Sequence, residues 1–254
     1  MAGLSTIGSI SFGIALVAGK NRVPRPAAGI TAFFTVRCCV VMLGSIAVTA
    51  DRMMRVCPGY NGRVTSPAAI KSEIRAAVRA ARIARGEDRR VAARAGLAER
   101  LSDLALTREA RSLSCFLPTS SEPDTRGFLE WAATRGIDVV LPSSRSDGLL
   151  DWIRPSGDGT VRGAHGIDEP LGEHLGPGAL AEVDLMLVPA AAVDLRGNRL
   201  GWGRGYFDRA LASLPHALPV FAVVFDDEVF ESVPVEAHDM PLTGVVTPER
   251  TLVF

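Results

Sequence analysis

Residues 184–211 read DLMLVPAAAVDLRGNRLGWGRGYFDRAL and form the most regular stretch of the chain. The apolar run over 184–189 predicts a buried strand, because it is continuous and short. Residues 196–198 (Arg-Gly-Asn) predict a turn, and the spacing of residues 206–214 predicts a helix directly after a glycine-rich loop. A buried strand, a loop and a helix in this order are typical of α/β domains.

The pattern before this stretch predicts two helices. Ser66-Pro67 is a strong helix start, because Ser is a good N-cap and Pro is favoured at the first helical position. Apolar residues then recur at helical spacing: Ile70, Ile74, Val78 and Ala81. A second helix is expected over 88–106, with an inward face made of Val91, Ala95, Ala98, Leu101 and Ala105.

Strands and a further helix are expected along the rest of the chain. The predicted strands cover 112–117, 137–141, 149–153, 219–225 and 243–246, the last being a short final strand, and a helix covers 127–134. The stretch 157–178 is dense in Gly, Pro, Asp and Glu and predicts loops. This alternation predicts an α/β fold, a three-layer sandwich with a mostly parallel central sheet and helices on both faces.

The overall charge gives no reason to expect a nucleic acid or an anionic membrane as partner. The 254 residues carry 28 Lys plus Arg and 28 Asp plus Glu, a net charge of zero. Residues 1–65 hold seven basic residues and one acid, a net of +6, so residues 66–254 carry −6. Cys115 is the single cysteine after residue 65, which excludes an internal disulfide there and fits a reducing cytoplasm.

Residues 1–65 differ from the remainder, and three interpretations compete. A signal peptide needs a basic start, but here Lys20 and Arg22 follow the first apolar run. A transmembrane helix over 27–50 would place Arg37 in mid-span, at about 2.5–3.5 kcal/mol. The third interpretation, which we favour over these and over an ordered addition, is an extension with little structure or a start codon assigned too far upstream. The folded domain is then expected to cover 66–254.

The glycine-rich loop suggests a phosphate site. Gly201, Gly203 and Gly205 alternate, and glycines let backbone N–H groups close on an anion at the start of a helix. A bare alternation also fits a tight hairpin, but Arg199, Arg204 and Arg209 add three guanidinium groups that suit phosphate oxygens. Asp208 beside such a site is a natural Mg²⁺ anchor.

Two other groups of residues have more than one interpretation. Lys71 and Arg75 share a face of the first predicted helix, which Arg79 and Arg82 extend. A solvated basic face is the ordinary interpretation, and a second phosphate clamp requires the helix to dock beside the loop. Glu122 either belongs to a turn before the next helix or faces the crevice at the carboxyl end of a strand.

The residues of this loop and its surroundings resemble the 5-formyltetrahydrofolate cyclo-ligase (methenyltetrahydrofolate synthetase) family over roughly residues 68–254. The long signature over 184–211 is the most specific part of the resemblance. Further landmarks occur in the family's order: Lys71 with Arg75, Glu122 to Thr125, Leu141-Pro142, Gly166-Ile167 to Glu169-Pro170, and Val233-Pro234 with His238-Asp239.

The resemblance implies an enzyme that uses ATP and Mg²⁺. In this reaction ATP phosphorylates the formyl oxygen of 5-formyltetrahydrofolate, N10 attacks the activated carbon, and 5,10-methenyltetrahydrofolate, ADP and phosphate are released. It implies ATP contacts for a set of residues: Lys71, Arg75, Arg199, Gly201, Trp202, Gly203, Arg204, Gly205, Tyr206, Phe207 and Asp208. It further implies that Glu122 holds the folate, that Asp208 lies near the metal, and that Arg204, Tyr206 and Asp208 serve catalysis.

Two positions depart from the family's pattern. Trp202 and Phe207 stand where tyrosine is frequent in the family, so position 207 keeps the aromatic ring and lacks the hydroxyl. Two alternatives stay open: a non-catalytic homologue that binds folate or nucleotide, and an enzyme that activates another formyl or carboxyl substrate. We expect a cytoplasmic monomer.

Overall fold

The structure is a computed structural model that describes residues 66–254 apart from 164–165, 215–217 and 237–238. The predictions for residues 1–65 and the landmark at His238 lie outside the described residues. The helices and strands in chain order are α2 (Pro67–Ala84), α3 (Glu87–Thr107), β1 (Ser112–Ser114), α4 (Arg126–Thr134), β2 (Asp138–Ser144), β3 (Leu150–Arg162), β4 (Asp168–His174), η2 (Pro177–Glu182), β5 (Leu185–Pro189), β6 (Ala192–Asp194), β7 (Arg199–Leu200), α5 (Tyr206–Ala212), β8 (Val220–Val223), η3 (Asp226–Glu228), β9 (Val229–Phe230), β10 (Gly244–Val246) and β11 (Thr251–Val253).

The centre of the fold is an eight-stranded sheet with the order β11-β10-β8-β5-β1-β2-β3-β4. The strands β10, β8, β5, β1 and β2 are parallel to one another, whereas β11 pairs antiparallel with β10 at one edge, and at the other edge β3 pairs antiparallel with both β2 and β4. In β5, Leu185 and Leu187 pack into one core, and Met186 and Val188 pack into the other. A strand buried on both faces needs a continuous apolar sequence, which explains why this run shows no alternation.

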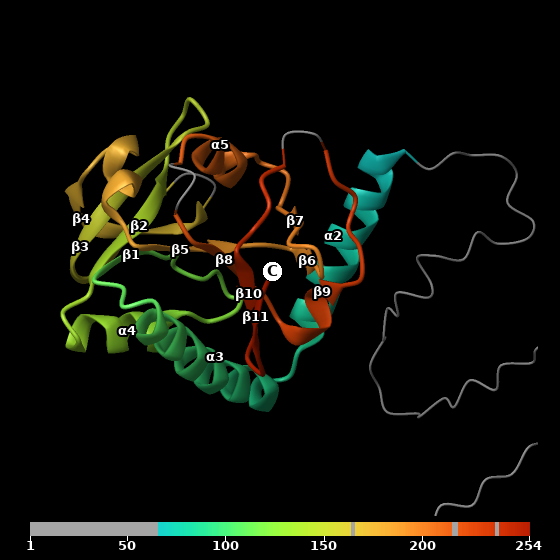
Figure 1. Ribbon diagram of the computed structural model, residues 1–254, viewed down its shortest axis with the longest axis horizontal. Coiled ribbons are helices and arrows are strands. Elements are labelled where there is room, and N and C mark those ends of the chain that lie inside the picture. Colours follow the sequence, from blue (N-terminus) through green and yellow to red (C-terminus); the bar gives the residue numbers. More distant parts are fainter. Residues whose placement is uncertain (1–65, 164–165, 215–217, 237–238) are drawn as a thin grey trace, which may run out of the picture. The chain divides into compact units, whose positions relative to one another are not determined.

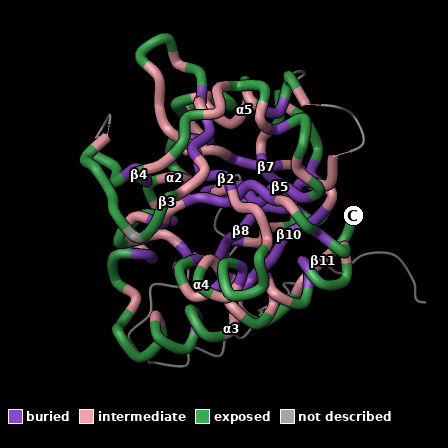
Figure 2. Tube along the Cα trace, turned by 90° about the vertical axis from the view of Figure 1, so that its left-hand side faces the viewer, coloured by how far each residue is buried: buried purple, intermediate pink, exposed green. Residues whose placement is uncertain are grey.

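Helices cover both faces of this sheet (Figure 1). On one face, α3 and α4 contribute Leu97, Leu101 and Phe128 to the core. On the other face, η2 and α5 contribute Leu180 and Leu211. Figure 2 shows the buried residues gathered along the central strands. The predicted α/β sandwich with a mostly parallel sheet is therefore confirmed.

A second, three-stranded sheet with the order β7-β6-β9 carries the glycine-rich loop. The helix α2 packs on it, because Ile74 and Val78 share a core with Leu200. The predicted start of α2 is confirmed: the Ser66 side chain accepts a hydrogen bond from the Ala69 N–H at 3.3 Å. The small sheet was not predicted, since each of its strands spans only two or three residues.

The predicted inward face of α3 is partly wrong. Leu101 and Ala105 are buried, but Val91 is 61% exposed and Ala95 is exposed as well, while Ala98 is half-buried. The buried face is instead made of Ala93, Leu97, Leu101, Leu104 and Ala105. The leucines bury more apolar area than valine or alanine, so they decide which side of the helix faces the sheet.

The prediction of loops over 157–178 is wrong, because β3 and β4 form a long antiparallel hairpin there. Their register shifts between Pro155 and Thr160, and this irregularity accommodates Gly157 and Gly159. β4 is the last strand of the sheet, so Pro170 is tolerated where a central strand would exclude it. A loop-like composition thus encodes an edge hairpin.

The C-terminal end of the chain also differs from the prediction. The strand expected over 243–246 is present as β10, but it is not the final one, because β11 follows and pairs with it antiparallel. None of the helices in the described ranges has both the length and the apolar character needed to cross a bilayer.

Candidate active site

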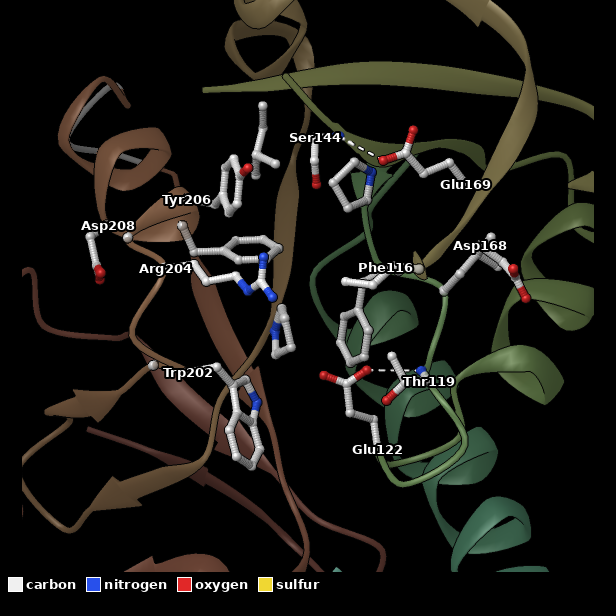
Figure 3. A pocket seen from close by; sticks show the side chains of 18 of the residues that line it. Phe116, Thr119, Glu122, Ser144, Asp168, Glu169, Trp202, Arg204, Tyr206 and Asp208 are labelled. Atoms are coloured by element: carbon white, nitrogen blue, oxygen red, sulfur yellow. Dashed lines mark hydrogen bonds between the residues drawn. The ribbon is translucent and has the colours of Figure 1, made fainter. Parts of the chain in front are cut away.

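A cleft lies where the carboxyl ends of β1, β2 and β5 meet the glycine-rich loop (Figure 3). Its empty space is ≈ 940 Å³, including open solvent at the mouth. Residues at or just after the three strand ends line it, among them Phe116, Pro142 and Pro189. Open α/β sheets bind their ligands at this edge, and the size is that of a small-molecule site.

The glycine-rich loop forms one wall of this cleft. Gly203 and Gly205 have φ of 88° and 72°, so the turn needs glycine at both positions. Within the described ranges, the N–H groups of residues 202–205 have no backbone hydrogen-bond partner. A loop of unpaired N–H groups can bind an anion.

Arg199 brings a buried positive charge to the same wall. Its side chain is 3% exposed and forms an ion pair with Asp208, which is 37% exposed. The pair uses Nη2 only, and the buried Nε and Nη1 atoms have no hydrogen-bond partner in the described part of the chain. Because buried guanidinium groups are normally satisfied, Arg199 keeps donors that its ion pair with Asp208 does not use.

Arg204 and Glu122 lie on opposite sides of the cleft (Figure 3). Arg204 is exposed, and its guanidinium points into the cleft. Glu122 lines the opposite wall, where one carboxylate oxygen accepts a hydrogen bond from the Thr119 N–H at 2.8 Å. The sequence interpretation that placed Glu122 at a strand-end crevice agrees with this position.

The basic residues of α2 dock beside the loop rather than facing solvent. Arg75 Nε donates to the Gly201 carbonyl at 2.7 Å, and Lys71 is buried with its Nζ 2.8 Å from Glu236 and 3.7 Å from Asp239. Neither Lys71 nor Arg75 lines the cleft. The ordinary interpretation of a solvated basic face is therefore wrong for Lys71 and Arg75, because tertiary contacts hold both charges, whereas Arg79 is exposed.

Arg82 is the clearest case of such a contact. It is 1% exposed and binds Glu228 with two hydrogen bonds of 2.7 Å, and it donates to the Ala190 carbonyl at 2.9 Å. Its guanidinium also lies 5.0 Å from the centre of the Trp202 ring. The helix α2 therefore supports the loop wall from behind.

The aromatic residues of the loop line the cleft as well. The Trp202 indole lies under Arg79 and Arg82, and its buried Nε1 has no partner among the described residues. Tyr206 donates its hydroxyl to the Arg145 carbonyl at 3.4 Å. Phe207 packs partly into the core beneath α5, where its ring makes apolar contacts and carries no hydroxyl as a tyrosine would.

Glu169 is a cleft residue to which sequence reasoning gave no role. It is 9% exposed and binds the Ser143 hydroxyl at 2.7 Å and the Ser144 N–H at 2.9 Å. It stands in the stretch 157–178 that was predicted as loops, and its one sequence signal is the landmark Glu169-Pro170.

Cys115 precedes Phe116 of the cleft but offers no thiolate. It is fully buried, and burial raises its pKa to about 12. The thiol therefore stays protonated, as expected of a core cysteine.

The residues present fit a magnesium ion that a substrate helps to hold. In the described ranges, no three His, Cys, Asp or Glu side chains form a metal cluster. Mg²⁺ needs only one or two carboxylates when phosphates supply other ligands. Asp208 lines the cleft, and its ion pair with Arg199 uses Oδ1 and leaves Oδ2 for a cation.

The chain therefore has an α/β fold with a cleft at the carboxyl ends of its strands, and this cleft is lined by arginines on the loop side and by carboxylates on the side opposite. More particularly, the chain belongs to the 5-formyltetrahydrofolate cyclo-ligase family, whose sequence model matches residues 67–248. These are ligase enzymes.

Individual relatives agree with this assignment. The 5-formyltetrahydrofolate cyclo-ligase of Mycolicibacterium smegmatis is 36% identical over 148 residues, which cover 56% of this chain and 76% of that protein. The Escherichia coli K12 protein of the same name is 32% identical over 147 residues, or 56% and 80% of the two chains. The solved structure of 5,10-methenyltetrahydrofolate synthetase from Aquifex aeolicus superposes with a TM-score of 0.62 and 29% identity, over 72% of this chain and 92% of that one.

Proposed function

We propose that this chain catalyses the ATP- and Mg²⁺-dependent cyclisation of 5-formyltetrahydrofolate to 5,10-methenyltetrahydrofolate, with release of ADP and phosphate. The observation that carries the proposal within the site is Arg199, which lines the cleft and whose buried Nε and Nη1 atoms have no hydrogen-bond partner among the described residues. Family membership supplies the substrates, and this arginine supports a phosphate as one of the bound groups.

The loop wall holds the nucleotide in this proposal. The N–H groups of residues 202–205 and the guanidinium groups of Arg199 and Arg204 surround the phosphates and offset the charge that grows during transfer. Arg75 holds the loop through its bond to Gly201. Lys71 would reach a phosphate only by sharing its ammonium with Glu236 and Asp239, to which it is paired.

The opposite wall holds the folate. Glu122 would accept hydrogen bonds from the pterin, and its bond to Thr119 fixes the carboxylate toward the cleft. The amide oxygen becomes a good leaving group once it is phosphorylated, and this phosphorylation requires the two substrates to be in contact. Holding them together is therefore itself a large part of such catalysis. The ring of Tyr206 closes the cleft beside Arg204.

Asp208 would hold Mg²⁺, which neutralises phosphate charge when bound. The contribution of this chain is the position of that carboxylate, which Arg199 fixes through their ion pair. The proposed protein acts in the cytoplasm as a monomer, without nucleic acid or membrane as partner.

The test is a direct assay of the full chain. Purified protein is mixed with 5-formyltetrahydrofolate, ATP and Mg²⁺, and methenyl formation is followed by absorbance. We expect product only when all three are present, and we expect EDTA to stop the reaction and added Mg²⁺ to restore it. Absence of ATP-dependent product from folded protein would refute the enzyme assignment. Product without ATP would refute the phosphorylation step.

A further inference from the structure

The carboxylate of Glu169 is built into the wall of the cleft. The residue lines the cleft from β4 and is nine-tenths buried. Its Oε1 accepts a hydrogen bond from the Ser144 N–H (Figure 3). Its Oε2 accepts one from the Ser143 hydroxyl, so both oxygens are fixed against the end of β2. A side chain held at both oxygens is preorganised rather than free to turn into solvent.

The chain makes room for this carboxylate at Gly163. A Cβ added at that glycine would lie 2.2 Å from Cδ and 2.5 Å from Oε1 of Glu169. Heavy atoms do not approach that closely, so any larger residue at 163 would displace the carboxylate. Gly163 therefore serves the position of Glu169, although its own φ does not demand glycine.

The charge of Glu169 lacks a cation in the part of the chain that the structure describes. No Lys, Arg or His of these residues forms an ion pair with it. Each oxygen has one donor, whereas an ionised carboxylate offers about four acceptor positions. Because a buried carboxylate is costly when its acceptors are unfilled, a ligand with N–H groups would stabilise it.

The two walls of the cleft differ in charge, and this difference favours the same kind of ligand at Glu169. Arg204 and Trp202 lie on the loop side, and Glu122, Asp168 and Glu169 lie on the other (Figure 3). A phosphate chain suits the first wall, and a ring edge rich in N–H donors suits the second. A reduced pterin carries such an edge in its amino group and neighbouring ring N–H groups.

We propose that Glu169 is a second substrate-binding carboxylate, which accepts hydrogen bonds from the N–H donors of the pterin ring of 5-formyltetrahydrofolate. This inference rests on the proposed function. It gives Glu169 a role in recognising the folate and none in binding ATP. Hydrogen bonds to a charged acceptor are strong enough for their loss to be measured in the folate affinity alone.

The test compares Glu169→Gln with a matched control, Glu173→Gln. Glu173 lies on the same strand, but its carboxylate is 65% exposed, pairs with Arg154 and does not line the cleft. For each full-length variant, KM for both substrates, kcat and Tm are measured, and the Kd for 5-formyltetrahydrofolate without ATP is measured by calorimetry. We expect Glu169→Gln to raise Kd and KM for the folate roughly 10- to 100-fold, with KM for ATP within about twofold of wild type.

A second variant guards against an effect of folding alone. Gly163→Ala keeps the carboxylate but displaces it, so it should weaken folate binding in the same direction. If Glu169→Gln or Gly163→Ala lowers Tm while folate Kd stays at the value of Glu173→Gln, Glu169 only clamps β2 and the proposal is wrong. Equal rises of KM for ATP and folate would also overturn it.

Calorimetry separates this inference from the proposed function. A wild-type chain that binds 5-formyltetrahydrofolate without cyclising it would refute the activity and leave the binding comparison valid. A wild-type chain that does not bind the folate at all would overturn both.

Discussion

The two walls of the cleft are held in place by different kinds of contact. The loop wall depends on α2, through Arg75 with Gly201 and Arg82 with Glu228, pairs that are 126 and 146 residues apart. The wall opposite depends on near neighbours: Glu169 binds residues 25 and 26 positions away, and its strand is half of a hairpin. The loop wall therefore depends on contacts between distant parts of the chain, whereas the position of Glu169 on the opposite wall depends on neighbouring strands.

The largest expected effect would break the support of the loop wall. Arg82→Ala leaves the buried carboxylate of Glu228 without its partner and should lower the free energy of unfolding by about 3–5 kcal/mol. Urea denaturation of the full chain measures this loss. Arg94→Ala is the control, because Arg94 is 44% exposed and its ion-pair partners Asp124 and Glu130 are 29% and 72% exposed, and it should cost about 0–1 kcal/mol. Equal losses would show that the buried pair does not fasten this wall.

A smaller effect concerns the turn that leads into the loop. Asp194 is 1% exposed and accepts hydrogen bonds from the N–H groups of Arg196, Asn198 and Val233 and from the Asn198 side chain. Burial raises the pKa of Asp194, but these hydrogen bonds outweigh it and hold the pKa below its usual 3.8. Asp194→Asn should therefore cost about 1–3 kcal/mol at pH 7.

The pH dependence sharpens this prediction. Since the folded-state pKa is lowered, the stability from Asp194 is present above its unfolded pKa and is lost as pH falls through the folded value. Wild type should thus lose more stability than Asp194→Asn below about pH 4, as measured by urea denaturation at pH 7, 5 and 3. Parallel curves for the two proteins would contradict the role given to these hydrogen bonds.

The smallest effect tests the exposed part of the loop wall. Arg204→Ala should raise KM for ATP or lower kcat by about tenfold, roughly 1.4 kcal/mol, with Tm unchanged, because the side chain is exposed and directs its charge at the phosphates. Arg196→Ala removes an equally exposed arginine that does not line the cleft and should leave the kinetics unchanged. Wild-type kinetics in Arg204→Ala would remove this residue from the site.

Elements with strong local signals could be predicted from the sequence. Ser66-Pro67 marks the start of α2, Ile74 and Val78 mark its buried face, and the run over 185–189 marks a doubly covered strand. The orientation of α3 could not be read correctly, because Val91 repeats at helical spacing although the leucines of another face bury more surface. Periodicity shows that a helix has a face, but packing decides which face is buried.

The carboxylate side of the cleft was harder to predict than the loop side. The alternation of Gly201, Gly203 and Gly205 by itself indicates an unusual backbone conformation. Glu169, in contrast, lies among glycines and prolines that are typical of loops. In the sequence Arg82 looks like part of a solvated basic face. In the fold it pairs with Glu228, which lies 146 residues further along the chain. Pairs so distant in sequence leave no periodic signal.

The long-range fastening of α2 has a consequence for biosynthesis. Lys71, Arg75 and Arg82 find their partners at Glu236, Gly201 and Glu228, all in the last quarter of the chain. At about 5–20 residues per second, a ribosome needs roughly 6–33 s to make the stretch between them. During that interval α2 cannot form these contacts, and its cationic side chains are accessible to other anions. Assembly of the loop wall is thus one of the last steps as the nascent chain folds.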